Sequence, residues 1–336
     1  MKKTLALVLA LCMVFALCAC GTKTDTTAPT NTAVAATDTD TVAVGAVIIA
    51  RDDVPSDEIY KFVKTIFDNK DAIAQQHGKG KELDVKFASS ITSVPYHPGA
   101  AKYFKEQGID VASVKEGAGE GASASLMFGT GSETGTYYGF GGVLASYVSA
   151  NSDVSVTAVT SGGSKANIED LSSGAVQIAF AQSDVLSYAY NGERLFDAKV
   201  EGFSVVAALY MEQVQIVTTN PDIKTVADLK GKTVSIGEAG SGVYFNALDV
   251  LQAYGMSESD VNAVRQSFGD SADSLKDGKI DAAFIVAGAP TTAITDLATA
   301  GPVYLVSLDD QHVQSLISAS PYYSAYTIPA DTYAAK

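Results

Sequence analysis

The 336-residue sequence has little of the chemistry that metal-binding and nucleic-acid-binding proteins use. It contains only three cysteines, three histidines and three arginines, and its 23 basic residues face 38 acidic ones, for a formal net charge of −15. Nucleic-acid phosphates bind to basic protein faces, so this charge balance disfavours nucleic-acid binding. The chain is 47% hydrophobic and 18% charged, which excludes a disordered chain and supplies the apolar surface for a sizeable core. The length indicates about two domains or lobes.

All three cysteines lie in the first twenty residues, so the rest of the chain cannot form an intramolecular disulfide. Two lysines and an apolar run over residues 5–16 make the pattern of an export signal, too short for a membrane-spanning helix. The small residue before Cys20 resembles the lipobox of bacterial lipoproteins, whose cysteine is lipidated; a cleaved signal without lipid is the alternative. We therefore expect a signal peptide over residues 1–19, then lipidated Cys20 and a flexible tether over residues 20–41.

The remaining sequence alternates between strand and helix patterns. Residues 42–50 form an apolar, β-branched run that is typical of a buried strand. Asp53 and Pro55 then favour a helix start, and apolar residues recur at steps of three and four up to Ile73. A short helix is predicted after His97, which we expect to cap it. The small, Gly-rich residues 112–124 lack any apolar periodicity and are predicted to be a linker.

Three pairs of segments recur in the same order and at a similar offset, which indicates an internal repeat: residues 128–140 with 236–246, 156–159 with 261–264, and 171–180 with 275–284. Such an ordered repeat favours two similar βαβαβ lobes and an α/β fold with a cleft between them. We assign residues 42–111 and 125–213 to lobe 1. Residues 214–333 then form lobe 2 with a return crossover.

Glycine-rich turns follow several predicted strands and open the next helices. A helix N-terminus has unpaired backbone N–H groups and a positive partial charge, and glycine lets a ligand approach it, so such a turn can bind an anion without a basic side chain. Ligands of open α/β sheets bind beyond the carboxyl ends of the strands. Ordinary N-capping explains any single turn; together the turns predict a small anionic ligand. They are residues 129–135, 161–164, 182–184, 240–242 and 288–291.

Enzyme motifs fit the sequence poorly. Gly129, Gly131 and Gly135 are spaced one residue too far for the dinucleotide fingerprint, and the sequence has no Walker A motif, no G-x-S-x-G elbow and no H-E-x-x-H motif. The histidines are scattered, and the cysteines all lie in the predicted leader, which disfavours a transition-metal site. We therefore expect a binding protein with no cofactor and no metal ion, and not an enzyme.

At these same residues the sequence resembles the TAXI family, the extracytoplasmic solute receptors of TRAP transporters. The resemblance is carried by GTGSETGTYYGFGG (129–142), TAVTSGGSKANIEDLSSG (157–174), AFAQSDVLSYAYNG (179–192), DAAFIVAGAPTTAI (281–294), PYYSAYTIPADTY (321–333) and VAVGAVIIARDDVPSDEIYKFVKTIF (42–67). It implies a two-lobed periplasmic-binding-protein fold, type II-like, that closes around a ligand and delivers it to a TRAP-type membrane permease. The ligands it implies are glutamate, related amino acids, and 2-oxo or hydroxy dicarboxylates.

The segment order departs from that family. In its members the segment resembling residues 42–109 follows the one resembling residues 321–333, whereas here it comes first. The sequence therefore resembles a circular permutant. Such permutants are tolerated where the original chain ends lie close together, so we expect Tyr333 and Val42 to lie near each other in the fold.

The chemistry and the resemblance together predict the ligand contacts. Backbone N–H groups of residues 132–136, 161–164 and 241–243 are expected to hold the ligand carboxylates, with hydroxyls and an amide adding hydrogen bonds. Tyr137 and Tyr210 could line the pocket or belong to the core. Glu212 could pair with a ligand ammonium group or be a solvated hinge charge. The candidates are Ser132, Thr134, Gly135, Tyr137, Ser161, Gly162, Gly163, Ser164, Gln182, Tyr210, Glu212, Ser241, Gly242, Ala289 and Thr291.

Arg51 is the one arginine that could clamp a carboxylate, although we expect it to support the hinge instead. The sequence thus predicts an extracytoplasmic solute receptor for a small carboxylate, glutamate-like or a 2-oxo or hydroxy dicarboxylate. We expect it to be a monomer, attached to the outer face of the bacterial cytoplasmic membrane through Cys20 or periplasmic. The alternatives are a receptor for an ABC importer, a ligand sensor, or an enzyme on the same scaffold.

Overall fold

The computed structural model describes residues 37–112, 114–121 and 125–333. The predicted signal peptide (1–19) and Cys20 lie outside the described residues, as does most of the predicted tether (20–41). The end of that tether was predicted wrongly, because residues 39–41 already belong to the first strand. Within the described ranges, no helix is both long enough and apolar enough to cross a membrane.

The described strands form a ten-stranded sheet in the order β3-β2-β4-β1-β5-β8-β6-β7, with β10 pairing with β1 and β9 with β5. Their bounds are β1 (Thr39–Arg51), β2 (Leu126–Gly129), β3 (Val156–Val159), β4 (Ile178–Gln182), β5 (Phe203–Thr218), β6 (Thr233–Ser235), β7 (Asn262–Val264), β8 (Ala282–Ala287), β9 (Tyr304–Leu305) and β10 (Ser324–Ile328).

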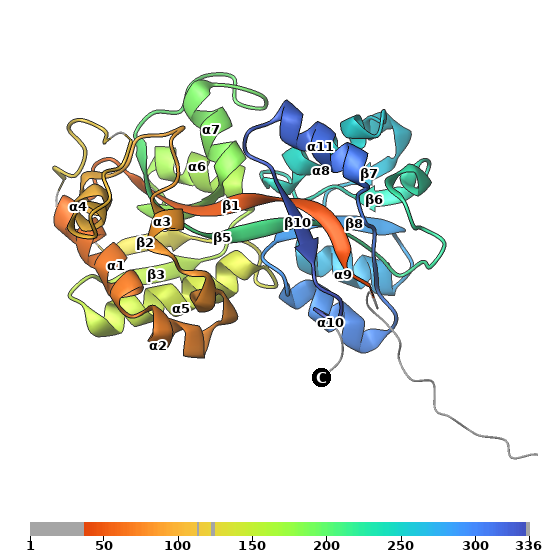
Figure 1. Cartoon of the computed structure of the whole chain (residues 1–336), viewed down its shortest axis with the longest axis horizontal. Coiled ribbons are helices and arrows are strands. Elements are labelled where there is room, and N and C mark those ends of the chain that lie inside the picture. The colour runs from red at the N-terminus through yellow and green to blue at the C-terminus, as the bar shows by residue number, and fades with distance from the viewer. Residues whose placement is uncertain (1–36, 113, 122–124, 334–336) are drawn as a thin grey trace, which may run out of the picture. The chain divides into compact units, whose positions relative to one another are not determined.

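Helices connect and cover these strands (Figure 1). They are α1 (Ser56–Asp68), α2 (Lys70–Gln76), α3 (Val85–Ala88), α4 (Pro98–Glu106), α5 (Thr136–Asn151), α6 (Ser164–Ser173), α7 (Ser183–Asn191), α8 (Val243–Ala253), α9 (Phe268–Lys276), α10 (Thr292–Ala300) and α11 (Asp310–Ala319). The described part of the chain also forms the 3₁₀ helices η1 (Gly78–Glu82), η2 (Val226–Leu229) and η3 (Glu258–Asp260).

The same arrangement of strands and helices occurs twice. In one half β2 pairs in parallel with β3 and β4, and in the other half β6 pairs in parallel with β7 and β8. The connecting helices are α5 and α6 in the first half and α8 and α9 in the second. The repeated segments in the sequence occupy equivalent places, so the predicted two-lobed α/β fold is confirmed. We call the half with β2–β4 lobe 1 and the half with β6–β8 lobe 2.

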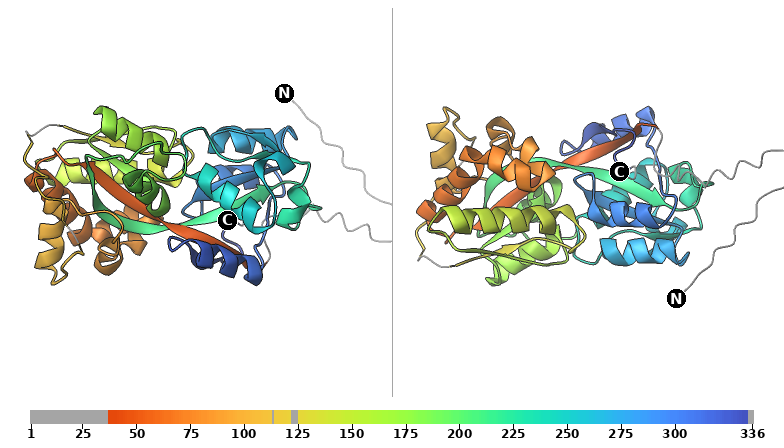
Figure 2. Two further views of the ribbon diagram at one scale, coloured as in Figure 1. Left: turned by 90° about the horizontal axis from the view of Figure 1, so that it is seen from above. Right: turned by 90° about the horizontal axis from the view of Figure 1, so that it is seen from below.

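Two long antiparallel strands, β1 and β5, belong to both lobes. Their pairing runs from Arg51↔Phe203 to Ala43↔Gln213. In lobe 1 β1 also pairs with β4, and in lobe 2 β5 also pairs with β8. Figure 2 shows the two strands side by side between the halves. The sequence predicted only residues 203–210 of β5, because polar residues interrupt the apolar run after Tyr210 although the strand continues to Thr218.

The apolar residues that recur at steps of three and four in α1 face the core of lobe 1. Ile59, Phe62 and Ile66 of α1 are fully or almost fully buried there. The helix ends at Asp68 and a second helix follows, in which Ile73 is buried. His97 caps α4 as predicted, since its side chain accepts a hydrogen bond from the backbone N–H of Gly99.

The described ends of the chain lie side by side, as the permuted order predicts. Thr39 at the start of β1 pairs with Ile328 at the end of β10, and the N–H of Ala330 donates to Asp38 Oδ1 over 2.9 Å. The Tyr333 hydroxyl donates to Gln215 Oε1, which fixes the last described residue to β5.

The described part of the predicted linker contacts the rest of the fold. Lys115 forms an ion pair with Asp52 at 2.6 Å, and the N–H groups of Gly119 and Ser56 donate to Asp52 O and Gly119 O respectively. These contacts hold the described part of the linker against the segment between β1 and α1.

A rearranged chain, in which residues 125–336 are followed by residues 37–121, should fold into the same structure. The new junction joins ends that already lie side by side. Circular dichroism should give the parent spectrum, with a thermal midpoint within about 5 °C of the parent. As a control, a chain opened inside β5, between Met211 and Glu212, should unfold at a much lower temperature. Equal behaviour of the two chains would contradict the role given to the crossing strands.

Candidate functional site

A cavity of about 50 Å³ lies where the two lobes face each other. Lobe 1 and the crossing strand β5 contribute Gly131, Ser132, Gly135, Thr136, Tyr137, Gly162, Gly163, Ser164, Gln182 and Glu212. Lobe 2 contributes Glu238, Ser241, Gly242, Val243, Gln266, Ser267, Phe268, Val286 and Ala287. The two lobes therefore supply the wall together, in the interlobe position that the sequence predicted for a ligand.

Within the described residues, four helices have both their N-cap residue and their first residue in the lining of this cavity: α5, α6, α8 and α9. Ser267 caps α9 with its side chain. The N-cap residues of the other three are Gly135, Gly163 and Gly242, which have no side chain to cap the helix. At α6 the Gly163 N–H donates to Ser161 Oγ and the Ala166 N–H to Gly240 O. Because a cap would occupy a first-turn N–H group, glycine at these positions leaves backbone donors and the positive helix ends available to a ligand.

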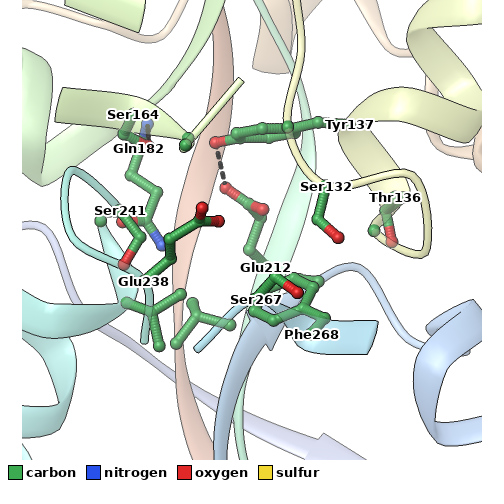
Figure 3. Close-up of a pocket in the computed structure, with 18 of the residues that line it drawn as sticks. Ser132, Thr136, Tyr137, Ser164, Gln182, Glu212, Glu238, Ser241, Ser267 and Phe268 are labelled. Carbon is green, nitrogen blue, oxygen red and sulfur yellow. Dashed lines mark hydrogen bonds between the residues drawn. The ribbon is translucent and has the colours of Figure 1, made fainter. Parts of the chain in front are cut away.

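The cavity contains carboxyl groups and no basic side chain among its described lining residues. Glu212 is only 2% exposed and accepts a hydrogen bond from the Tyr137 hydroxyl at 2.6 Å. Figure 3 shows Tyr137 pointing to Glu212, with Ser132 and Glu238 also at the cavity. This burial excludes the alternative that Glu212 is a solvated hinge charge. Its pairing with a ligand ammonium group stays a prediction.

Burial raises the pKa of Glu212 to about 8, because a charged carboxylate loses its hydration inside the protein. The hydrogen bond from Tyr137 and the nearby charge of Lys79 lower this pKa, and the charge of Asp184 raises it further. Near neutral pH the ligand-free protein therefore keeps much of Glu212 protonated. A cation placed beside it would favour the ionised form.

Tyr137 is held in place by the core beneath it. Its ring stacks on Phe180 of β4, with ring centroids 4.5 Å apart and an interplanar angle of 6°. Phe180 stacks in turn on Phe128 of β2. The sequence left open whether Tyr137 lines a pocket or belongs to the core, and the structure shows both: the ring is buried, and the residue lines the cavity.

Ten of the predicted contact residues are brought together at the cavity, and five are not: Thr134, Ser161, Tyr210, Ala289 and Thr291. Tyr210 and Thr291 are buried within the protein, whereas Thr134, Ser161 and Ala289 are partly exposed outside the lining. Tyr210 is 1% exposed, and the Thr291 hydroxyl accepts a hydrogen bond from Gln215 Nε2 at 3.1 Å. The Ala289 N–H donates to Gln213 Oε1 at 2.7 Å. The turn at residues 288–291 thus fastens lobe 2 to β5.

Arg51 has neither of the roles considered for it. It pairs with Asp53 and lies at the Phe203 end of β1, whereas Val44, further along the same strand, pairs with Glu212. Arg51 is therefore remote from both the cavity and the middle of the crossing strands.

Beyond the predicted candidates and backbone donors, the lining includes residues that the sequence missed, among them Gln266 and Ser267 just before α9 and Phe268 at its start. A signal for the turn before α9 was present. It follows β7, the repeat counterpart of β3, and the turn after β3 had been predicted to bind. Ser267 followed by Asp270 is also a typical N-cap pattern.

The lobes touch directly around the cavity, so the structure is a closed form. Thr136 Oγ1 donates to Gly288 O at 2.8 Å, and the Ala166 N–H donates to Gly240 O at 2.9 Å. A Cβ atom at Gly242 would lie 1.6 Å from Gln182 Oε1, so any side chain there has to displace Gln182.

Gly242→Ala should weaken solute binding and lower the thermal midpoint, because the new methyl group displaces the Gln182 side chain. Gly142→Ala in α5 is the matched control, since its Cβ would meet open space, and it should stabilise the protein by about 0.5–1 kcal/mol. Calorimetry of solute binding and thermal unfolding of both variants measure the difference. Equal effects would show that Gly242 is not needed for close approach.

Glu212→Gln should reduce the pH dependence of stability in the ligand-free chain. The folded protein holds a proton on Glu212 up to about pH 8, whereas the unfolded chain releases it near 4.5. Stability from this group is therefore present below pH 4.5 and is lost as pH rises towards 8, by up to about 1.4 kcal/mol per pH unit. Urea unfolding at several pH values in this window should give a smaller slope for the variant. Identical slopes would contradict the raised pKa.

Comparison with known proteins places the chain in a family. A sequence model of the NMT1-like family matches residues 20–108 and 128–336. The alkanesulfonate-binding protein SsuA from Xanthomonas axonopodis pv. citri, solved with MOPS, is 20% identical over 55% of this chain and 61% of its own, with a TM-score of 0.37. An ancestral arginine-binding protein bound to glutamine is 20% identical over 56% of this chain and 80% of its own, with a TM-score of 0.39. The chain thus spans about three fifths of the first of these proteins. From the family match, this chain belongs to the NMT1-like family.

Proposed function

We propose that this chain is an extracytoplasmic solute-binding protein that captures a small carboxylate and presents it to a membrane permease. The observation that carries the proposal is the cavity itself. Three glycine-capped helix N-termini and the buried Glu212 meet between two lobes that are in contact. Unpaired amides and positive helix ends bind carboxylates, and a closed cavity removes the bound solute from water. The proposed role is binding without catalysis.

Both carboxyl groups of the lining favour a solute that also carries a cationic group. Glu212 and Glu238 would repel a pure dicarboxylate when ionised, whereas an ammonium group beside Glu212 would stabilise its charged form. A glutamate-like amino acid satisfies the helix ends with its carboxylates and Glu212 with its ammonium group. A 2-oxo or hydroxy dicarboxylate is accommodated only when Glu212 is protonated. The O–H of the Glu212 carboxyl group can then donate a hydrogen bond to the solute.

The crossing strands provide the motion that release requires. β1 and β5 carry both lobes, and Glu212 lies on β5 where Val44 of β1 pairs with it. Flexing of this strand pair would separate the lobes and open the cavity. We propose a TRAP-type permease as the recipient, and export with a lipid anchor at Cys20; an ABC importer or a signalling partner is the alternative.

The full chain, purified without denaturation, should carry a small carboxylate that native mass spectrometry detects. Isothermal titration calorimetry should then show that Glu212→Gln weakens binding of L-glutamate by about tenfold or more, because a charge-assisted hydrogen bond is lost, with a much smaller effect on 2-oxoglutarate.

Glu238→Gln is the matched control, since Glu238 lines the same cavity but is not hydrogen-bonded to Tyr137 in the described structure. Its effect on L-glutamate should be the smaller one. If Glu212→Gln lowered the affinity for L-glutamate and for 2-oxoglutarate equally, the proposed pairing of Glu212 with a ligand ammonium group would be contradicted. Failure of the wild-type chain to bind any carboxylate would refute the proposed function.

A further inference from the structure

Phe245 belongs to lobe 2 by its place in the chain but packs in the core of lobe 1. It lies in the first turn of α8 and is 1% exposed. Ala247, Val250 and Leu251 of the same helix pack in the core of lobe 2, whereas Phe245 packs with the buried residues of lobe 1. Helix α8 therefore buries two faces, one in each lobe.

The lobe 1 side of this contact consists of aromatic rings. The Phe245 ring stacks on Tyr188 of α7, with ring centroids 5.7 Å apart, and on Phe196, which follows α7, with centroids 6.3 Å apart. Tyr188 and Phe196 are also buried. Buried aromatic rings stabilise a structure chiefly through the apolar area that they remove from water. Separation of the lobes would return part of this area to water.

A charged contact joins the lobes beside these rings. Arg194, in the segment after α7, donates from Nη2 to Asp249 Oδ1 of α8 at 2.7 Å. Its guanidinium group also lies over the rings of Tyr188 and Phe245, 5.1 Å and 5.7 Å from their centroids. The Arg194 side chain is 34% exposed, and partly exposed ion pairs contribute little. We therefore expect the Phe245 ring to contribute more to this interface than the ion pair does.

Opening of the cavity must break these contacts. Gly242, the N-cap residue of α8, lines the cavity beside Gln182, and Phe245 follows Gly242 within one helical turn. The next residue, Asn246, donates from Nδ2 to Asp184 Oδ2 of α7 at 2.9 Å. A lobe rotation that moves Gly242 away from Gln182 therefore withdraws Phe245 from lobe 1. Phe245 is not among the described lining residues, so its contact forms whether or not a solute is bound.

These residues are called the interlobe latch: Tyr188, Arg194, Phe196, Phe245 and Asp249. We propose that the interlobe latch holds the lobes closed from outside the solute cavity and thereby slows the release of any bound solute. A solute leaves only after the lobes separate, so a weaker latch should speed the release of every solute by the same factor. The role in release rests on the proposed function, whereas the closing role is a property of the protein alone.

Phe245→Ala in the full chain removes the buried ring. Release of radiolabelled L-glutamate and of radiolabelled 2-oxoglutarate into excess unlabelled solute should each become about tenfold faster or more. Val250→Ala is the control, because Val250 lies on the same helix but packs in lobe 2. It should lower the thermal midpoint and leave both release rates near those of the wild type. Wild-type release rates in Phe245→Ala, or faster release of only one solute, would overturn the inference.

Arg194→Met tests the latch with every buried ring in place. Loss of the ion pair and of the ring contacts should speed release by about two- to fivefold. Arg265→Met is the matched control, because Arg265 makes the same two kinds of contact inside lobe 2. It pairs with Glu258 at 3.1 Å and lies 3.9 Å from the centroid of the Tyr244 ring. Equal release rates in the two variants would overturn the place of Arg194 in the latch.

A further readout needs no solute. Small-angle X-ray scattering of the solute-free full chain should give a larger radius of gyration for the double variant Phe245→Ala with Arg194→Met than for the wild type, and no change for Val250→Ala. An unchanged radius in the double variant would overturn the inference. If the wild-type chain binds neither probe while the radius differs in this way, the proposed function fails and the latch stands.

Discussion

Backbone hydrogen bonds between β1 and β5 run from Arg51↔Phe203 in lobe 1 to Ala43↔Gln213 in lobe 2, and both lobes are built outward from them. β4 extends the sheet on one side and β8 on the other. Farther out in the sheet, β2, β3 and β6 lead into the glycine turns and helix starts that converge at the cavity. The site therefore depends on two strands that belong to neither lobe alone.

The positive charge at the cavity comes from the ends of helices and not from basic side chains. A chain with three arginines and an excess of acidic residues has no basic side chain among the described lining residues. Helix N-termini supply the positive end, and the buried Glu212 supplies a group whose charge depends on what lies beside it. Under the proposed function, such a cavity would distinguish solutes by the placement of their charged and hydrogen-bonding groups.

Much of the fold could be predicted from the sequence, because apolar periodicity and a repeat are local signals. The second half of β5 could not, since Glu212, Gln213 and Gln215 are polar residues buried by partners distant in the sequence. From the glycine turns of lobe 1, the sequence predicted most of the cavity wall that this lobe supplies. The turn at 288–291 looked the same in sequence but packs on β5, and the bonds joining Asn246 to Tyr323 link residues that no sequence pattern relates.

Lobe 1 is a single excursion of the chain. Within the described residues, the backbone enters it through β1 and leaves it through β5, while the segments on either side, up to Thr39 and beyond Thr218, lie with lobe 2. A ribbon of two hydrogen-bonded strands bends readily across its face but resists sliding within its plane. The two lobes are consequently joined along one pair of strands, and the motion that remains between them is close to rotation about a single axis.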